Sequence, residues 1–293
     1  MATLVTARDW DIFRALARCP LTVRQMEKVS ETFSAPFRRE RRLQRRLHAL
    51  TAAGLVRQWR YATSGPGVPC YYTLSPESYR LLHGHDAILP GHRVFEPLSN
   101  SRQQHTRALA DFIVHTAVAA HRADYAIADF HREGSLRLQV GTDFLYPDCT
   151  FRLVTPDGRT FDFFTELDNG TETVHTQDGR GSFEHKIRFY EAYKDQCKAL
   201  GKDHRFRVIL VGTGTGKRLG HLLARSKELL HLKHRPLVYG VTLGEYLDCE
   251  TPLTNRCLLD NCGERRALVP PAPIHMSPTA QAAAVALAKV GPL

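Results

Sequence analysis

Three acidic residues in the middle of the chain stand at the ends of two apolar segments. Asp148 follows Pro147 near the start of YPDCTFRLV, and Glu166 and Asp168 lie at the end of TFDFFTELD. Side chains alternate along a β-strand, so Glu166 and Asp168 share one face. Two like charges this close repel each other unless a cation lies between them. We therefore predict a site for Mg²⁺ or Mn²⁺, which prefer oxygen ligands, at Asp148, Glu166 and Asp168.

A β-hairpin would position these acids. The two apolar segments are joined by TPDGR, in which Asp157 and Gly158 are typical turn residues. Asp148 lies about ten residues before this turn and Glu166 about eight residues after it. Antiparallel pairing across the turn therefore places Asp148 beside Glu166.

The surrounding segments predict an α/β (mixed) fold. A helical pattern begins at HTRALADFIVHTAVAAH, and the strand-like segments YAIADFH, LRLQV and the two segments of the hairpin follow. A helix is expected from about Phe183 to Leu200, then the buried strand FRVILVG, the helix KRLGHLLARSKELLHL and the strand LVYGVTL. Such an order is typical of a mixed sheet with helices on its faces.

The first third of the chain has a different pattern. Two short helical segments, capped by Thr6 and Thr22, precede a third, FRRERRLQRRLHALTAAG. In the third segment Leu43, Leu47 and Leu50 form one apolar stripe, while arginines occupy the opposite side. Two strands joined by a Gly/Pro turn follow. Three helices and then a hairpin are the order of a winged helix-turn-helix domain.

This order indicates a DNA-binding domain, with the third helix in the major groove and the hairpin with its 64–69 turn near phosphates. Two alternatives stay open: arginines that are merely solvated, and a domain used for protein–protein contact, as in a homodimer. The arginines that we predict to bind DNA are Arg38, Arg41, Arg42, Arg45, Arg57 and Arg60.

Charge is distributed unevenly. The formal net charge is +10, and residues 1–100 hold 15 Lys and Arg against 8 Asp and Glu. A basic first third suggests that an anionic partner docks there. We predict a winged helix over 1–82, a linker over 83–104, the α/β domain over 105–250 and a partly disordered C-terminal extension over 251–293.

Several classes of protein are disfavoured. The sequence contains no run of 18 apolar residues, the length needed to span a membrane. The N-terminal segment MATLVTARDWDIF lacks the apolar stretch of a secretory signal. Seven scattered cysteines indicate a reducing compartment, so we expect a cytoplasmic protein. The segment VGTGTGKRLG fails as a phosphate-binding loop, because Val211 and Arg218 replace the required Gly and Ser or Thr.

The acids also resemble the core of the PD-(D/E)XK nucleases. In that superfamily the Asp and Glu, here Asp148 and Glu166, hold a divalent metal, and a lysine two residues past the Glu orients or activates the attacking water. This chain departs from the pattern there, since Asp168 occupies the position of the lysine.

The resemblance suggests substitutes from neighbouring helices. Lys186, in the helix FEHKIRFYEAY, takes the place of the missing lysine, because some members of the superfamily carry it elsewhere. Tyr190 lies four residues further on the same helical face. His105 takes the place of an acidic residue that some members carry in the first helix. The catalytic residues implied are Asp148, Glu166, Asp168 and Lys186.

The whole arrangement is similar to the replication-relaxation family of bacterial mobile elements over about residues 6–245. That family joins a winged helix to a segment with PD and then E-x-D-x-G-T-E, here Glu166 to Glu172. The resemblance implies a DNA-binding protein of a plasmid or other mobile element. Three interpretations of the acids stay open. The protein is a metal-dependent DNA endonuclease, or it is a non-catalytic regulator of replication or transcription whose former site only binds. In the third interpretation the acids have no function and merely precede the Asn169-Gly170 turn.

Overall fold

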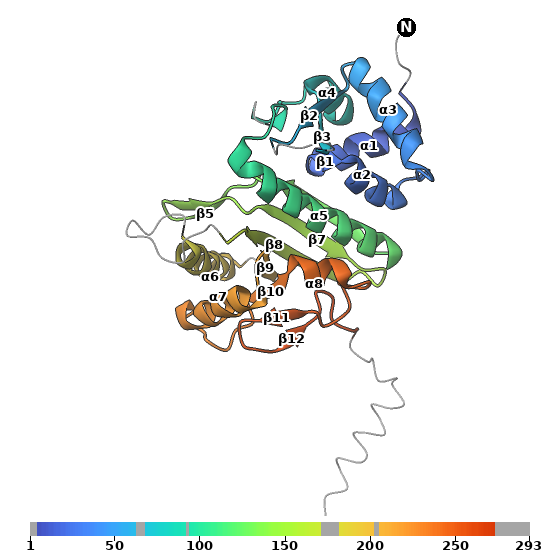
Figure 1. The fold of residues 1–293 in the computed structure, drawn as a ribbon. Coiled ribbons are helices and arrows are strands. Elements are labelled where there is room, and N and C mark those ends of the chain that lie inside the picture. Colours follow the sequence, from blue (N-terminus) through green and yellow to red (C-terminus); the bar gives the residue numbers. More distant parts are fainter. Residues whose placement is uncertain (1–4, 63–67, 92–93, 171–181, 202–204, 273–293) are drawn as a thin grey trace, which may run out of the picture.

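The computed structural model describes most of the chain, and the mixed α/β class is confirmed (Figure 1). The predicted turn at 64–69 falls largely outside the described part, as do Thr171, Glu172 and the end of the C-terminal extension. The described residues are 5–62, 68–91, 94–170, 182–201 and 205–272.

Three helices and then a β-hairpin form most of the N-terminal part, in the predicted order; a two-residue strand pairs with the hairpin and a fourth helix follows it. Leu43, Leu47 and Leu50 of the third helix are fully buried, as the leucine stripe predicts. Gly54 ends that helix with a φ of 73°, a conformation in which glycine is unstrained. The strand order is β1-β3-β2. The elements are α1 (Ala7–Arg18), β1 (Leu21–Thr22), α2 (Val23–Val29), the 3₁₀ turn η1 (Ser30–Thr32), α3 (Glu40–Ala52), β2 (Val56–Arg60), β3 (Cys70–Leu74) and α4 (Pro76–His83).

A seven-stranded sheet follows, in the order β12-β11-β10-β9-β8-β7-β4. The central strands β8, β9 and β10 are parallel, and β7, β4, β11 and β12 are added antiparallel on both sides. The strands are β4 (Ala126–Arg132), β7 (Cys149–Val154), β8 (Thr160–Asp168), β9 (Phe206–Gly212), β10 (Val238–Thr242), β11 (Leu258–Asp260) and β12 (Arg265–Arg266). A separate hairpin is formed by β5 (Leu138–Val140) and β6 (Asp143–Leu145).

Helices cover both faces of this sheet, as the alternation of apolar side chains in β8 requires. Phe163 and Leu167 belong to the core on the α5 side, whereas Phe164 stacks on Tyr190 of α6, with 5.7 Å between ring centroids. Figure 1 shows α5 between the N-terminal part and the sheet, and α6 and α7 beyond the sheet. These helices are α5 (Asn100–Arg122), α6 (Phe183–Ala199), α7 (Gly216–Leu229) and α8 (Leu243–Asp248).

Two boundaries differ from the prediction. Helix α5 begins at Asn100 rather than His105, so part of the expected connection is helical. Most side chains of that first turn face solvent, which is why apolar spacing did not reveal it. The sheet also continues past residue 250, since β11 and β12 pair beside β10, and strands of three and two residues are too short for a visible alternation.

None of the helices in the described ranges has the length and apolarity needed to cross a membrane.

The packing of β10 against α7 gives a test of the fold. A Cβ added at Gly240 would lie 2.9 Å from Cδ1 of Leu223 and 3.0 Å from Cδ1 of Leu219. We expect Gly240→Ala to lower the free energy of unfolding by about 1–3 kcal/mol through overpacking, measured by urea denaturation. Gly244→Ala in α8 is the control, because nothing lies within 4 Å of its added Cβ. Equal stability of the two variants would contradict this packing.

Candidate functional site

The predicted hairpin forms and brings the first two acids together. Strands β7 and β8 pair with Cys149 opposite Thr165. Beyond that pair, the Asp148 amide donates to the Thr165 carbonyl at 3.1 Å, and Oδ2 of Asp148 accepts from the Leu167 amide at 2.7 Å. Asp148 therefore lies beside Glu166, as the spacing predicts.

Glu166 is held by two side chains of α6. Lys186 Nζ lies 2.8 Å from one carboxylate oxygen, and the Tyr190 hydroxyl donates to the other at 2.5 Å. Only 5% of Glu166 is exposed, so these partners replace water around its carboxylate. Lys186 and Tyr190 can both reach Glu166 because they are one helical turn apart. The predicted approach of Lys186 to the acids is observed.

Asp168 has a different partner from the one expected. Arg218, in the first turn of α7, donates to both carboxylate oxygens through Nε at 2.6 Å and a terminal nitrogen at 2.9 Å. The Gly170 amide adds a third bond at 3.1 Å. Asp168 shares a face with Glu166, but its charge is already neutralised. Sequence reasoning missed Arg218 as a partner, although its place after a Gly-rich strand-to-helix turn was a signal.

A second group of side chains surrounds Asp148. Nε2 of His105 on α5 lies 3.2 Å from its Oδ1, which supports the predicted position of His105 in the site. Glu133 follows β4, and ligand atoms of His105, Glu133 and Asp148 all lie within 4.8 Å of one another. Glu133 was missed because the β4–β7 pairing shifts register between Ala128 and His131, which no sequence pattern announces.

A cavity of about 670 Å³ opens beside these residues. It lies between the end of α1, Pro90 and Val94, α5 and the end of β4, and Asp148 and Glu133 are at its wall. Arg18, Arg102 and Arg132 also line it. Arg102 pairs with Glu133, and the positive charges of Arg18 and Arg132 suit a phosphate group better than a neutral ligand.

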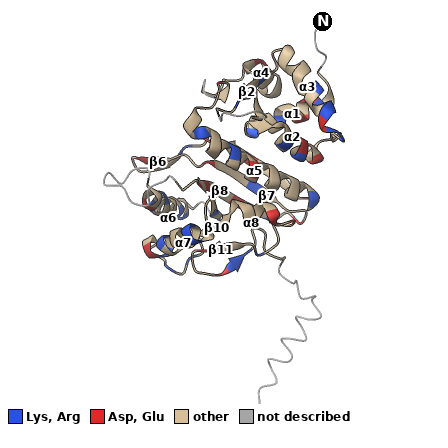
Figure 2. Ribbon diagram, viewed as in Figure 1, with Lys and Arg blue, Asp and Glu red and all other residues tan. Residues whose placement is uncertain are grey.

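The arginines predicted to bind DNA divide into two groups. Arg38, Arg41, Arg42 and Arg45 are exposed on and before α3, which Figure 2 shows as a basic part of the molecule, and Arg60 is also exposed. Arg57 instead donates to the Phe95 carbonyl at 2.9 Å and lies 3.3 Å from Glu96, so its guanidinium is partly engaged within the protein.

The sequence profile of the replication-relaxation family matches residues 17–209, about two thirds of the chain. The chain belongs to the replication-relaxation family. No curated protein and no solved structure is significantly similar to it. The matched segment of this replication-relaxation protein contains Asp148, Glu166, Asp168 and Lys186 and ends in β9, before Arg218.

Asp148 and Glu166 have pKa values shifted in opposite directions. Burial raises the pKa of Glu166 to about 7; the positive charge of Lys186 opposes this rise and the negative charge of Asp148 adds to it. Burial also raises the pKa of Asp148, but the hydrogen bond and charge of His105 and the charge of Lys186 outweigh it and hold that pKa below its usual value. Burial lowers the pKa of His105, but the hydrogen bond to Asp148 and the charges of Asp148 and Glu133 together outweigh burial, so that pKa is raised. The replication-relaxation protein thus places a carboxylate beside a carboxyl that titrates near neutrality.

The donor set around Asp148 fits a divalent cation. Two carboxylates and one imidazole can bind Mn²⁺, and with water they can also bind Mg²⁺. Of the residues described, His105, Glu133 and Asp148 form the group close enough for this. The predicted metal roles of Glu166 and Asp168 remain predictions; these carboxylates contact Lys186 and Arg218, and Glu133 likewise contacts Arg102.

The raised pKa of Glu166 gives a prediction about stability. Its pKa of about 7 exceeds its ordinary value of 4.5, so the folded protein retains a proton that the unfolded chain releases. Glu166 therefore stabilises the fold at low pH, and this contribution is lost as the pH rises through about 7. Glu166→Gln cannot titrate, so we expect its free energy of unfolding, measured by urea denaturation, to fall less than that of the wild type between pH 5 and pH 8.

The control is Asp195→Asn, which changes an exposed acid of α6 and should leave the wild-type pH dependence intact. An equal loss of stability in Glu166→Gln and wild type would show that Glu166 has an ordinary pKa.

Proposed function

We propose that the protein is a divalent-metal-dependent nuclease that acts on DNA of a plasmid or other mobile element. The observation that carries this proposal is the convergence of Asp148, which directly precedes β7, with Glu166 of β8 and Lys186 of α6. Lys186 Nζ lies 2.8 Å from Glu166. An acid pair with a neighbouring lysine is suited to phosphodiester hydrolysis. Membership of the replication-relaxation family supports the DNA context.

Each residue has a role in this proposal. Asp148, with His105 and Glu133, would hold the cation, which would supply charge stabilisation to the phosphoryl oxygens. Glu166, with a pKa near neutrality, accepts a proton from the attacking water. Lys186 positions Glu166 and offsets the charge that develops on the phosphate. Asp168 acts indirectly, by fixing Arg218 and the end of β8.

The substrate would be held by two surfaces. We propose that the N-terminal part is a winged helix that binds duplex DNA through the exposed arginines of α3. The cavity beside Asp148 lies between this part and the sheet, and Arg18 and Arg132 would contact the phosphate to be cut.

The nuclease proposal predicts cleavage of DNA in the presence of Mg²⁺ or Mn²⁺. We expect Asp148→Asn, Glu166→Ala and Lys186→Met each to lower the cleavage rate about 100-fold or more, because charge stabilisation and proton transfer contribute on this scale. The measurement follows nicking and shortening of labelled single- and double-stranded DNA over time.

Asp195→Asn serves as the matched control, because it removes an exposed acid of the same helix as Lys186 and should cleave like the wild type. A wild type that leaves every single- and double-stranded substrate intact with both metals would overturn the nuclease proposal.

A second function is supported by one observation. The residue two positions past Glu166 is Asp168, bound to Arg218, and both oxygens of Glu166 already contact Lys186 and Tyr190. Because the carboxylate oxygens already have partners within the protein, this arrangement favours a site that now stabilises the fold and no longer catalyses a reaction. In that case the protein is a non-catalytic DNA-binding regulator of replication or transcription, and the cavity retains a strand without cutting it.

Both functions require DNA binding by α3. We expect Arg41→Ala with Arg45→Ala to weaken duplex binding and to reduce the slope of log affinity against log salt by about 2, as two phosphate contacts are lost. Fluorescence anisotropy at several salt concentrations measures this. Lys198→Ala with Lys227→Ala removes two exposed charges from α6 and α7 and is the control. A salt slope unchanged in the α3 variant would rule out these contacts.

A further inference from the structure

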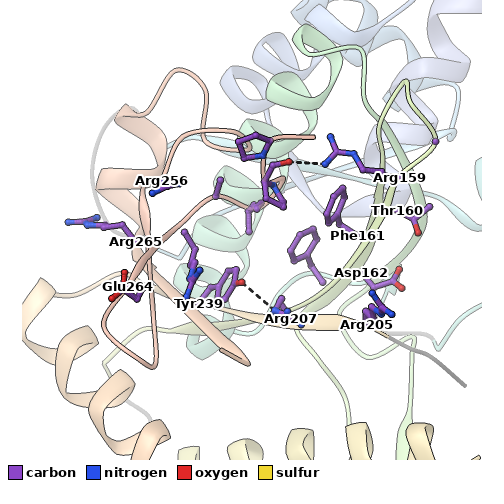
Figure 3. Close-up of a pocket in the computed structure, with 17 residues that line it drawn as sticks. Arg159, Thr160, Phe161, Asp162, Arg205, Arg207, Tyr239, Arg256, Glu264 and Arg265 are labelled. Carbon is purple, nitrogen blue, oxygen red and sulfur yellow. Dashed lines mark hydrogen bonds between the residues drawn. The ribbon is translucent and has the colours of Figure 1, made fainter. Parts of the chain in front are cut away.

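A second cavity of about 640 Å³ lies at the other end of the central strands (Figure 3). Its wall combines the start of β8 and β9 with β10 and the segment around β11 and β12, and Figure 3 shows side chains from these elements gathered around one hollow. Its volume lies within the range of small-molecule sites. The arginines that line it are Arg159, Arg205, Arg207, Arg256, Arg265 and Arg266.

This cavity is distinct from the proposed nuclease site. Phe161 and Phe163 of β8 line it, whereas Glu166 lies further along the same strand. Side chains alternate along a strand, so Phe161 and Phe163 point to the opposite face of the sheet from Glu166. Tyr239 and Arg256 of the cavity also lie beyond the segment that the family profile matches.

Positive charge in the cavity is only partly neutralised. Arg266 pairs with Asp260 at 2.7 Å and Arg159 with Asp157 at 2.8 Å. Asp162, one of two acids in the wall, already pairs with Arg152. The charges of these three groups are therefore largely balanced by local partners.

Three arginines carry the excess charge. Arg265 donates to the neutral Cys257 carbonyl at 3.1 Å, and Arg207 and Arg256 are the other two. Arg207 donates to the Tyr239 hydroxyl at 3.3 Å and to the Phe206 carbonyl at 2.9 Å, and both acceptors are neutral. No hydrogen bond or ion pair of Arg256 is found among the residues that the structure covers. Glu264 is the remaining acid of the wall. An anion entering the cavity would therefore meet a positive potential.

Aromatic rings lie beside these guanidinium groups. The guanidinium carbon of Arg207 is 5.9 Å from the centre of the Tyr239 ring, and that of Arg159 is 5.5 Å from the centre of Phe161. Phe161 is partly exposed, so its ring is accessible to a flat ligand. Arginines next to accessible rings can bind the phosphate and the base of one nucleotide at the same time.

We propose that this cavity is a second, non-catalytic nucleotide-binding site. The phosphate lies against Arg207 and Arg256, and the base packs on Phe161. The nucleotide is either free or one unit of a single strand, since both carry the same chemistry. This site is independent of the proposed nuclease function, because Asp148, Glu166 and Lys186 do not line the cavity.

The test uses the full chain carrying Arg41→Ala and Arg45→Ala, without divalent metal, so that binding by α3 and cleavage are both suppressed. Anisotropy of a short labelled thymidine oligonucleotide is measured, with free dTMP as the competitor. Arg207→Ala and Arg256→Ala should each weaken binding about 10-fold, the scale of a hydrogen bond to a charged group. Phe161→Leu should weaken it about 5-fold or more through lost stacking.

Controls separate a site from general charge. Lys227→Ala removes one exposed charge from α7 and should bind like the background protein. Photocrosslinking of an oligonucleotide with a photoreactive thymidine should label peptides that contain Phe161 or Tyr239. Competition by dTMP identifies a free nucleotide as a ligand, and binding of the oligonucleotide alone identifies a strand.

Three results would overturn the proposal. The first is unchanged binding in both arginine variants, and the second is an equal loss in Lys227→Ala. The third is displacement of the oligonucleotide by a polyglutamate peptide at the same charge concentration, which would show a site for any polyanion. Cleavage assays with Arg256→Ala should remain at the wild-type rate, so failure of this proposal leaves the nuclease proposal intact.

Discussion

The hydrogen bond from the Leu167 amide to the Asp148 carboxylate is the constraint on which the site depends. It continues the β7–β8 pairing just before the first residue of β7, with a side chain in place of a carbonyl. Because this bond fixes Asp148 against the backbone of β8, the spacing between Asp148 and Glu166 is set by the hairpin rather than by flexible side chains. His105 and Glu133 can then gather at the outer side of Asp148.

Burial of the acids makes the helices on that face indispensable. Glu166 and Asp168 are buried beside Phe164 on one face of β8, and an unpaired carboxylate there would be costly. Lys186 and Tyr190 of α6 compensate Glu166, and Arg218 of α7 compensates Asp168. One strand end thus contacts two crossover helices, so movement of α6 would alter the pKa of Glu166 and movement of α7 would separate Arg218 from Asp168.

Positive charge is concentrated in three places around this acidic centre: α3, the cavity beside Asp148 and the cavity at the opposite end of β8. The first two lie on the side of the molecule that α5 shares with the N-terminal part (Figure 1). Since α5 contacts α2 and also supplies His105, it joins the basic surface to the acids. A long anionic ligand could therefore contact both at once, in agreement with the proposed action on DNA.

Local patterns in the sequence determined the hairpin, its turn, the shared face of Glu166 and Asp168, the leucine stripe of α3 and the place of Lys186 and Tyr190 on one helical face. These depend on residues close in sequence and on fixed periods of strand and helix. The rest of the site depends on tertiary structure. A register shift in β4 places Glu133, and the crossover to α7 places Arg218. Two very short strands at one edge of the sheet complete the arginine-lined cavity, and in each case residues far apart in the chain come together. No local period encodes such contacts, and so only the folded chain decides which charge neutralises which.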